Sequence, residues 1–265
     1  METVTSADGT TIAYDRTGSG PPLLRVHGGT SDRTSWHHLR PPFEEHFTVY
    51  LMDRRGRGDS GDSDAYALER EFEDVAAVVD SIDAPVSLVG HSFGALCSLG
   101  AALRTDNLHK LVLYEPPLLV DGHQNHETPQ ELLAKMESLV AEGKNEELLE
   151  LFLLEVPKIT PEELEEFRTT PNWPATVKSA PTNVREFEAV LDYEFDPARF
   201  EGLTTPTLLL SGSESPPFLQ AATDTLVDTL PNCRRTVFDG EGHLAMNSAP
   251  ERYTDELLGF VRDST

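Results

Sequence analysis

Residues 86–103 read VSLVGHSFGALCSLGAAL, and this stretch decides the fold. An apolar run leads into Gly90-His91-Ser92-Phe93-Gly94, and small or apolar residues follow it. The pattern predicts a buried strand that turns sharply into a helix, with Ser92 at the turn. A glycine two places before the serine and another two places after it leave room for a tight backbone. We therefore predict that Ser92 is a nucleophile; a chance match to a short pattern is the alternative.

Outward from this turn the chain alternates between strands and helices. Apolar residues at 68, 72, 75, 79 and 82 recur in steps of four and three, which predicts one buried helical face. Expected strands cover 2–5, 11–17, 23–26, 47–52, 86–89, 109–114, 207–210 and 234–238, and the first two form a hairpin. Expected helices cover 33–39, 68–82, 95–103, 218–230 and 251–261. The alternation predicts an α/β fold with a mostly parallel sheet and helices on both faces.

The alternation stops between about Leu118 and Asp196, where only acidic helical segments are predicted. Thr128-Pro129-Gln130-Glu131 and Thr160-Pro161-Glu162-Glu163 each have the pattern of a capping box. Further helices are expected over 146–154 and 184–191. We interpret residues 118–195 as an inserted helical cap over the active edge of the sheet, and 1–117 with 196–265 as the core. A peripheral decoration is the alternative for the insertion.

The composition excludes several classes of partner. The chain has 46 Asp and Glu against 21 Lys and Arg, a net charge of −25, which disfavours nucleic acid and anionic membranes. Cys97 and Cys233 form no disulfide framework and no metal-ligand pattern, so we expect no cofactor and no metal. The sequence lacks an apolar run of about 18 residues, and Met1-Glu2-Thr3-Val4 does not resemble a signal peptide. We expect a cytoplasmic protein whose partner is a small-molecule acyl substrate.

The excess of acidic residues also leads to a prediction about salt. Repulsion among so many carboxylates destabilises the folded state unless salt screens it. We interpret the charge of −25 as an adaptation to high internal salt, with an ordinary acidic protein as the alternative. The thermal midpoint is therefore expected to rise from dilute buffer to molar potassium chloride. A midpoint that does not rise in thermal melts would contradict this interpretation.

A nucleophilic serine needs a base and an acid that orients the base. His243 follows an expected strand in Gly240-Glu241-Gly242-His243 and is the predicted base. In chain order the acid is expected between the serine and the histidine. Glu214, at the end of another expected strand, is the predicted acid, and Glu115, after the strand that ends at Tyr114, is the alternative.

Backbone amides are the expected donors to the oxyanion of an acyl-transfer reaction. The amide of Phe93, the first residue after the nucleophile, is one candidate. His27-Gly28-Gly29 ends a neighbouring strand, and Gly29 is the expected second donor. Candidates for the pocket wall are, by their position in the chain, Thr30, Trp36, Leu118 and Trp173.

These motifs together resemble the α/β-hydrolase fold family, close to its cofactor-free haloperoxidase-like branch of serine esterases. The matching segments are His27-Gly28-Gly29, the D-x-R-G-x-G-x-S loop from Asp53 to Ser60, the Gly90–Gly94 turn, Glu214 and Gly242-His243. The resemblance implies a Ser92-Glu214-His243 triad and a helical cap that shapes an acyl pocket. The family commonly has Asp three residues after the strand-end glycine, where this chain has Ser215, so Glu115 stays open as the acid.

The resemblance and the residues predict a serine hydrolase that cleaves carboxylic esters, lactones or thioesters. Ser92 argues against epoxide or haloalkane hydrolysis, for which relatives use an aspartate at this turn. Hydrolysis of a carbon–carbon bond by the same triad is one alternative. A ligand-binding protein with an inert triad is another. The substrate and the oligomeric state do not follow from the sequence.

Overall fold

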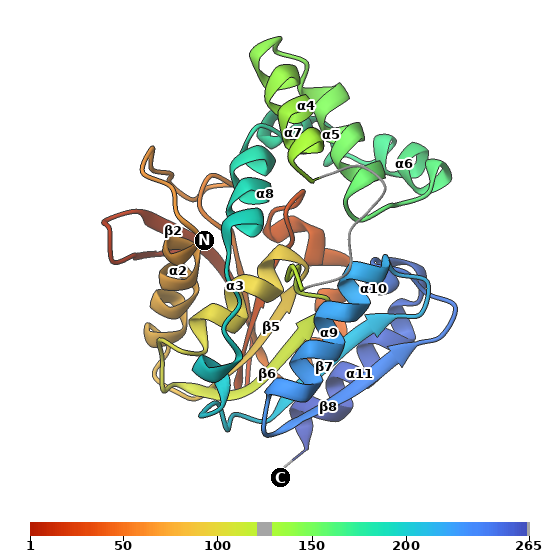
Figure 1. Cartoon of the computed structure of the whole chain (residues 1–265). Helices are drawn as coiled ribbons and strands as arrows, with labels where there is room; N and C mark the ends of the chain where they lie inside the picture. Colours follow the sequence, from red (N-terminus) through yellow and green to blue (C-terminus); the bar gives the residue numbers. More distant parts are fainter. Residues whose placement is uncertain (121–128, 264–265) are drawn as a thin grey trace.

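A computed structural model describes residues 1–120 and 129–263 of the chain. An eight-stranded sheet in the order β1-β2-β4-β3-β5-β6-β7-β8 crosses the molecule, with helices on both sides (Figure 1). The strands are β1 (Glu2–Thr5), β2 (Thr11–Gly18), β3 (Pro22–Val26), β4 (Thr48–Met52), β5 (Val86–His91), β6 (Leu108–Tyr114), β7 (Thr207–Gly212) and β8 (Cys233–Phe238). β2 pairs antiparallel with β1 and β4, and all the other pairs are parallel. The predicted hairpin and the mostly parallel sheet are confirmed.

Each face of the sheet is covered by helices whose apolar sides form a core. On one face lie α2 (Leu68–Asp80), α3 (Phe93–Ala101) and α9 (Pro217–Thr229). On the other lie η1 (Arg33–Leu39), α1 (Arg40–Glu44) and α11 (Pro250–Arg262). The expected helix over 33–39 is a 3₁₀ segment, and a short helix, α10 (Ala245–Ser248), was not expected. Side chains alternate across the central strands, so both faces are apolar, as expected for a sheet that is covered on both sides.

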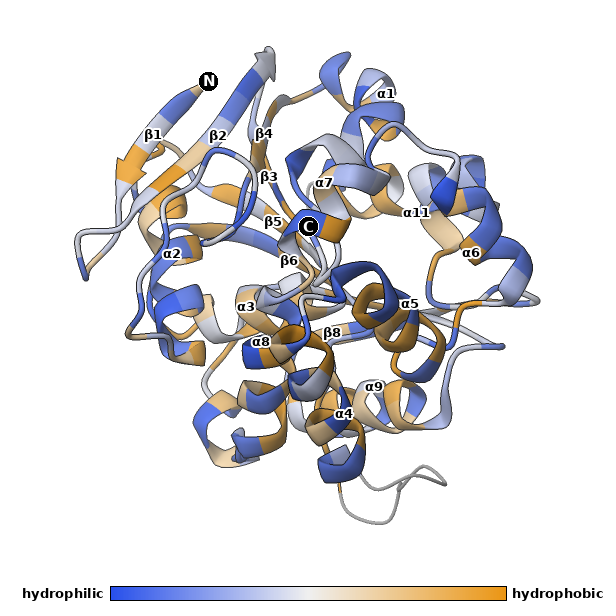
Figure 2. Ribbon diagram, turned by 90° about the horizontal axis from the view of Figure 1, so that it is seen from above, coloured by the Kyte–Doolittle hydropathy of each residue, from blue (hydrophilic) through white to orange (hydrophobic). Residues whose placement is uncertain are grey.

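A helical cap lies above the carboxyl edge of the sheet (Figure 1). In the sequence it is inserted between β6 and β7. It consists of α4 (Pro129–Ala141), α5 (Asn145–Glu155), α6 (Pro161–Arg168), α7 (Trp173–Ser179) and α8 (Thr182–Asp192). These helices share an apolar cluster of their own, and Figure 2 shows their hydrophobic sides seen from above. Both hydrogen bonds of the capping box at Thr160 and Glu163 are present. The capping box predicted at Thr128 lies outside the described residues.

The cap also packs against the core at both ends of the insertion. Leu118, just after β6, and Val190, in α8, belong to the buried cluster that α2 and α3 form. Tyr193 packs edge-on against Phe72 of α2, with ring centroids 6.1 Å apart. The cap is therefore packed against the main core near both of the points where it joins the core.

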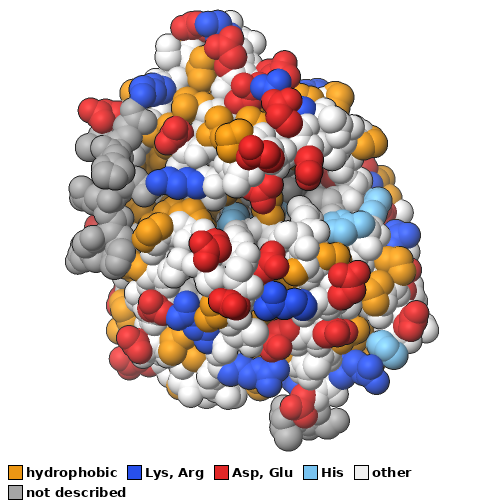
Figure 3. Space-filling view, turned by 90° about the vertical axis from the view of Figure 1, so that its right-hand side faces the viewer, with side chains coloured by type: hydrophobic (Ala, Val, Ile, Leu, Met, Phe, Trp, Pro, Cys, Tyr) orange, Lys and Arg blue, Asp and Glu red, His pale blue; other side chains and the backbone are white. Residues whose placement is uncertain are grey.

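The surface reflects the acidic composition. Figure 3 shows Asp and Glu side chains spread over the cap and the core on the face in view. Within residues 1–120 and 129–263, none of the helices combines the length and apolar character that a membrane span requires.

Candidate active site

Ser92 occupies a sharp turn between β5 and α3, as predicted. Its φ of 53° and ψ of −126° lie in a region that non-glycine residues rarely adopt. The two flanking glycines permit a close approach of backbones. A Cβ on Gly90 would lie 2.5 Å from the Gly94 carbonyl oxygen, and one on Gly94 would lie 2.3 Å from the His27 carbonyl oxygen. The G-x-S-x-G spacing is therefore required by packing at this turn.

His243 lies on the loop after β8 and contacts a buried carboxylate. Its Nδ1 is 2.5 Å from Oε2 of Glu115, which directly follows β6 and is entirely buried. The other oxygen of Glu115 accepts a hydrogen bond of 2.7 Å from the Gly212 amide at the end of β7. Glu115 has a φ of 47°, a second strained position at the carboxyl edge of the sheet. Both oxygens of this carboxylate are thus held in place.

This arrangement corrects the predicted partner of His243. Glu214 is exposed, its backbone amide donates to the Glu241 carbonyl, and its carboxylate lies 3.4 Å from the Ser213 hydroxyl. The predicted contact between Glu214 and His243 is therefore wrong, and the alternative residue, Glu115, makes it. Both acids follow strands that lie between β5 and β8, but the side chain of Glu115 is buried against His243, whereas that of Glu214 is exposed.

Two further residues hold the backbone around His243. The Tyr114 hydroxyl donates to the Gly242 carbonyl at 2.7 Å, and Nε2 of His91 lies 3.0 Å from the His243 carbonyl oxygen. The His91 and His243 rings are adjacent, with centroids 4.7 Å apart. Burial, followed by the charge of His243, lowers the pKa of His91 well below 6.5, so His91 is a neutral donor at neutral pH.

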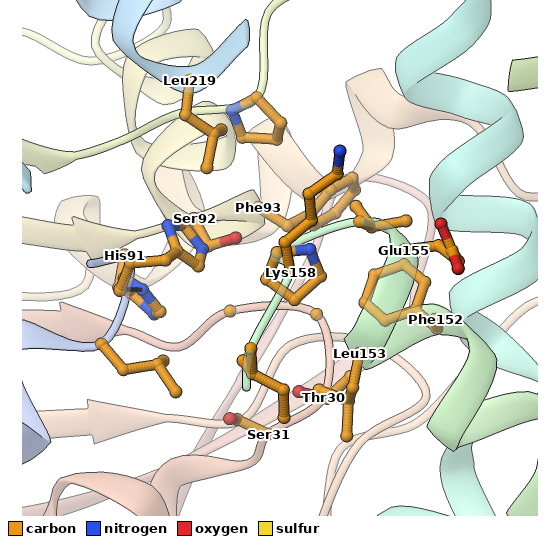
Figure 4. A pocket seen from close by; sticks show the side chains of 18 of the residues that line it. Thr30, Ser31, His91, Ser92, Phe93, Phe152, Leu153, Glu155, Lys158 and Leu219 are labelled. Carbon is orange, nitrogen blue, oxygen red and sulfur yellow. Dashed lines mark hydrogen bonds between the residues drawn. The ribbon is translucent and has the colours of Figure 1, made fainter. Parts of the chain in front are cut away.

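One cavity of about 970 Å³ is lined by Ser92, His243 and the two expected oxyanion residues, Gly29 and Phe93. Figure 4 shows Ser92 and Phe93 facing Phe152 and Leu153 of α5 across this space. Large apolar side chains form much of the rest of the wall, among them Leu132, Phe167, Phe187 and Leu219. A cavity of this size and character suits a small organic molecule with an apolar part.

The four expected pocket residues are only partly brought together. Thr30 lines the cavity. Trp36 is buried in the cluster beneath the sheet, Leu118 in the cluster of α2 and α3, and Trp173 in the core of the cap. The side chains of Trp36, Leu118 and Trp173 therefore fill hydrophobic cores, where large apolar residues are usually found.

Two buried side chains of the D-x-R-G-x-G-x-S loop are bonded to groups that do not line the cavity. The buried carboxylate of Asp53 accepts hydrogen bonds from the backbone amides of Arg33 and Asp59. Arg55 is paired with Asp74 of α2 at 2.6 Å and 2.7 Å. These contacts fix the loop against the core. Within residues 1–120 and 129–263, no three His, Cys, Asp or Glu side chains are grouped so that they could hold a metal ion.

Two of the buried histidines, His27 and His91, predict a dependence of stability on pH. Burial lowers the pKa of His27 and His91 well below 6.5. Below pH 6.5 the unfolded chain binds protons that the folded chain does not, so the free energy of unfolding falls as the pH falls. His91→Gln is expected to make this fall shallower by up to about 1.4 kcal/mol per pH unit. Urea denaturation of both proteins at several pH values between 7.5 and 5 measures the slopes, and equal slopes would contradict the prediction.

Comparison with known proteins gives the family. A model of the alpha/beta hydrolase family matches residues 26–256. An alpha/beta hydrolase from Sphaerobacter thermophilus has a crystal structure that superimposes with a TM-score of 0.85 at 34% identity, covering 98% of this chain and 100% of that one. Lipase LipV of Mycobacterium tuberculosis is 33% identical over 124 residues, but the match spans 46% of this chain and 47% of the lipase.

A longer match has a different named activity. The 2-hydroxy-6-oxo-6-(2'-aminophenyl)hexa-2,4-dienoic acid hydrolase of Metapseudomonas resinovorans is 24% identical, over 98% of this chain and 91% of that protein. An uncharacterized hydrolase of Bacillus subtilis, YraK, is 33% identical over 45% of its own length. The chain therefore matches less than half of two of these curated relatives and nearly all of the third. The extent of the family match and the similarity of the Sphaerobacter structure lead to one conclusion: this chain belongs to the alpha/beta hydrolase family of enzymes.

Proposed function

We propose that this protein is a serine hydrolase that cleaves uncharged esters, lactones or thioesters of small carboxylic acids through an acyl-enzyme on Ser92. The observation that carries the proposal is the contact of 2.5 Å between His243 Nδ1 and Glu115, on the cavity that Ser92 also lines. Because Glu115 occupies Nδ1, Nε2 is the ring nitrogen available to take the serine proton.

The reaction follows from these positions. His243 removes the proton of the Ser92 hydroxyl as its oxygen bonds to the acyl carbon, and the amides of Gly29 and Phe93 bind the oxyanion that forms. Glu115 stabilises the positively charged imidazole. The oxyanion then collapses, the bond to the alcohol breaks, and His243 gives its proton to the departing alcohol. A water molecule, deprotonated by the same histidine, then attacks the acyl carbon. The bond between that carbon and Ser92 breaks, His243 returns its proton to the Ser92 oxygen, and the acid is released.

The charge of the cavity wall supports an uncharged substrate. Glu155, Glu163 and Glu166 line the cavity, whereas Lys158 is the one Lys or Arg among its described lining residues. Glu186 also lines it, but its charge is paired with Arg54 and Arg57. Lys158 and Glu155 are both exposed, and Figure 4 labels both of them in the pocket. An excess of carboxylates disfavours an anionic ligand in a confined space.

Hydrolysis of a carbon–carbon bond is the second candidate, and the Metapseudomonas relative favours it. That relative is named for a dienoic acid, a substrate that has a carboxylate. A carboxylate buried in this cavity would need a cationic partner, and the acidic wall described above supplies mainly opposing charge. We therefore place ester hydrolysis first.

A matched pair of substrates tests the proposal. p-Nitrophenyl pentanoate and mono-p-nitrophenyl glutarate have acyl chains of equal length, but the second ends in a carboxylate. We expect turnover of the pentanoate and a kcat/KM at least roughly tenfold lower for the glutarate, equivalent to ~1.4 kcal/mol. A fluorophosphonate should also label Ser92. If the folded protein cleaves a 6-oxo-dienoic acid but no ester, the carbon–carbon hydrolase replaces this proposal. If it cleaves neither and takes no label, a binding function does.

A further inference from the structure

Arg54 contacts both segments that hold the expected oxyanion donors. The side chain is entirely buried, and its Nε and Nη2 donate to the carbonyls of His27 and Gly28, each at 3.2 Å. Its guanidinium carbon lies 4.7 Å from the centroid of the Phe93 ring. One side chain therefore connects the loop before Gly29 with the first residue after the nucleophile.

The same guanidinium is paired with a carboxylate of the cap. Both oxygens of Glu186, in α8, accept from Arg54 Nη2 at 3.1 Å, and one also accepts from Arg57 at 2.8 Å. Glu186 is almost fully buried and lines the cavity, and a Cβ on Gly29 would lie 3.4 Å from its Oε2. The carboxylate thus lies against the oxyanion loop, 132 residues away from Arg54 in the sequence.

Charge balance explains why this carboxylate needs the arginines. An unpaired negative charge beside Gly29 would raise the energy of the oxyanion that forms there. Burial alone would lower the pKa of Arg54, but Glu186 and Glu71 outweigh it and keep the pKa above its ordinary value, so Arg54 stays charged. Burial raises the pKa of Glu71 to about 7 against the attraction of Arg54. Among the described residues, the carboxylates paired with Arg54 are Glu186, from the cap, and Glu71, from α2.

A contribution to stability does not account for the buried polar cluster of Arg54, Arg57, Glu71, Asn183 and Glu186. Nε of Arg57, Nδ2 of Asn183 and Oε2 of Glu71 are buried without a hydrogen-bond partner among the described residues. Incompletely paired buried charges are costly, and apolar residues of similar size are often at least as stabilising in their place. The cluster therefore lowers the stability of the fold, and its position beside the oxyanion loop points to a role in the reaction.

We propose that Arg54 and Glu186 are positioning residues that fix the oxyanion loop and tie its geometry to the docking of the cap. This inference rests on the proposed serine hydrolase function. Arg54 holds the carbonyls of the loop so that the Gly29 amide faces the cavity, and Glu186 holds Arg54 from above. Neither side chain contacts the reacting atoms; both act through the backbone of residues 27–29 and through Phe93.

Arg54→Met and Glu186→Gln test the proposal, with Arg55→Met as the matched control. Arg55 is also fully buried in the same loop and ion-paired, but neither Arg55 nor its partners Asp74 and Asp8 line the cavity. We expect Arg54→Met to lower kcat for p-nitrophenyl pentanoate by about 10- to 100-fold, less than loss of a direct oxyanion donor. KM should stay within about threefold of the wild-type value, since the contacts that bind the ester before the reaction are unchanged. Arg55→Met should lower the melting temperature but keep the kcat of the folded enzyme within about threefold.

Partial rescue separates positioning from simple loss of stability. Arg54→Met leaves Glu186 with reduced charge compensation beside the oxyanion, so adding Glu186→Gln should recover part of kcat. A trifluoromethyl ketone, whose adduct with Ser92 has an oxyanion, should lose affinity in step with kcat. If Arg54→Met and Arg55→Met lower kcat equally per folded molecule, the proposal is wrong. If Arg54→Met does not fold, the kcat values of Glu186→Gln and Arg54→Lys are compared with that of Arg55→Met in the same way.

Hydrogen exchange gives a readout that does not depend on activity. The amides of residues 28–30 should exchange faster in Arg54→Met and Glu186→Gln than in wild type, and at the wild-type rate in Arg55→Met. Unchanged exchange in both test variants would overturn the proposal. If the wild type cleaves no ester and takes no label, the hydrolase function fails, and the exchange rates still decide whether these two residues fix the loop.

Discussion

Glu115→Gln is expected to lower kcat for p-nitrophenyl pentanoate by about 10³- to 10⁴-fold, with little change in KM. The amide keeps the size of the carboxylate and can still accept from the Gly212 amide. It cannot stabilise a positive charge on His243, and its NH₂ group favours the wrong tautomer of the imidazole. The measurement is steady-state turnover, together with a thermal melt that shows the variant to be folded.

Glu214→Gln is the matched control for this prediction. It makes the same chemical change in an exposed carboxylate after the next strand of the sheet. Its kcat should stay within about twofold of wild type, as is usual for a surface substitution. Loss of turnover in Glu214→Gln with activity retained in Glu115→Gln would reverse the assignment of the acid.

Ser92→Ala is expected to have an effect at least as large, because it removes the atom that forms the acyl-enzyme. Turnover should fall by about 10⁵- to 10⁶-fold, which leaves only the contribution of binding and the oxyanion amides. Labelling by a fluorophosphonate should disappear from the peptide that contains residue 92. Intact mass and turnover, measured on the same sample, report both effects.

Ser87→Ala controls for the loss of a buried serine from this part of the chain. Ser87 is buried in β5, five residues before the nucleophile. Its variant should keep both turnover and labelling. Retained ester turnover in Ser92→Ala would mean that another residue is the nucleophile, and the proposed mechanism would have to be abandoned.

The elements around Ser92 could be predicted because local chemistry determines them. Gly90 and Gly94 are the residues that allow the backbones to approach, so the sharp turn follows from their spacing. Amphipathic periodicity located α2, and capping chemistry located α6. α7 was not expected, because its seven residues include Pro174 and Thr176 and are too few to show a helical period.

The partner of His243 could not be chosen from the sequence, because the choice depends on where each of the two side chains lies in the folded protein. Glu115 and Glu214 each follow a strand that ends at the same edge of the sheet. Glu115, with a φ of 47°, has its carboxylate buried at the histidine, whereas the carboxylate of Glu214 is exposed. The link between Arg54 and Glu186 was missed for a similar reason, since nothing local to either residue indicates a partner so distant in the chain.

The acidic wall of the cavity has a consequence for the end of the catalytic cycle. Hydrolysis of an uncharged ester creates an acid that ionises at neutral pH, so the product acquires a charge that the substrate lacked. Glu155, Glu163 and Glu166 then repel the newly formed anion, with Lys158 opposing them. For the proposed ester hydrolysis, these carboxylates therefore favour release of the acid product, and accumulated acid should inhibit the enzyme only weakly.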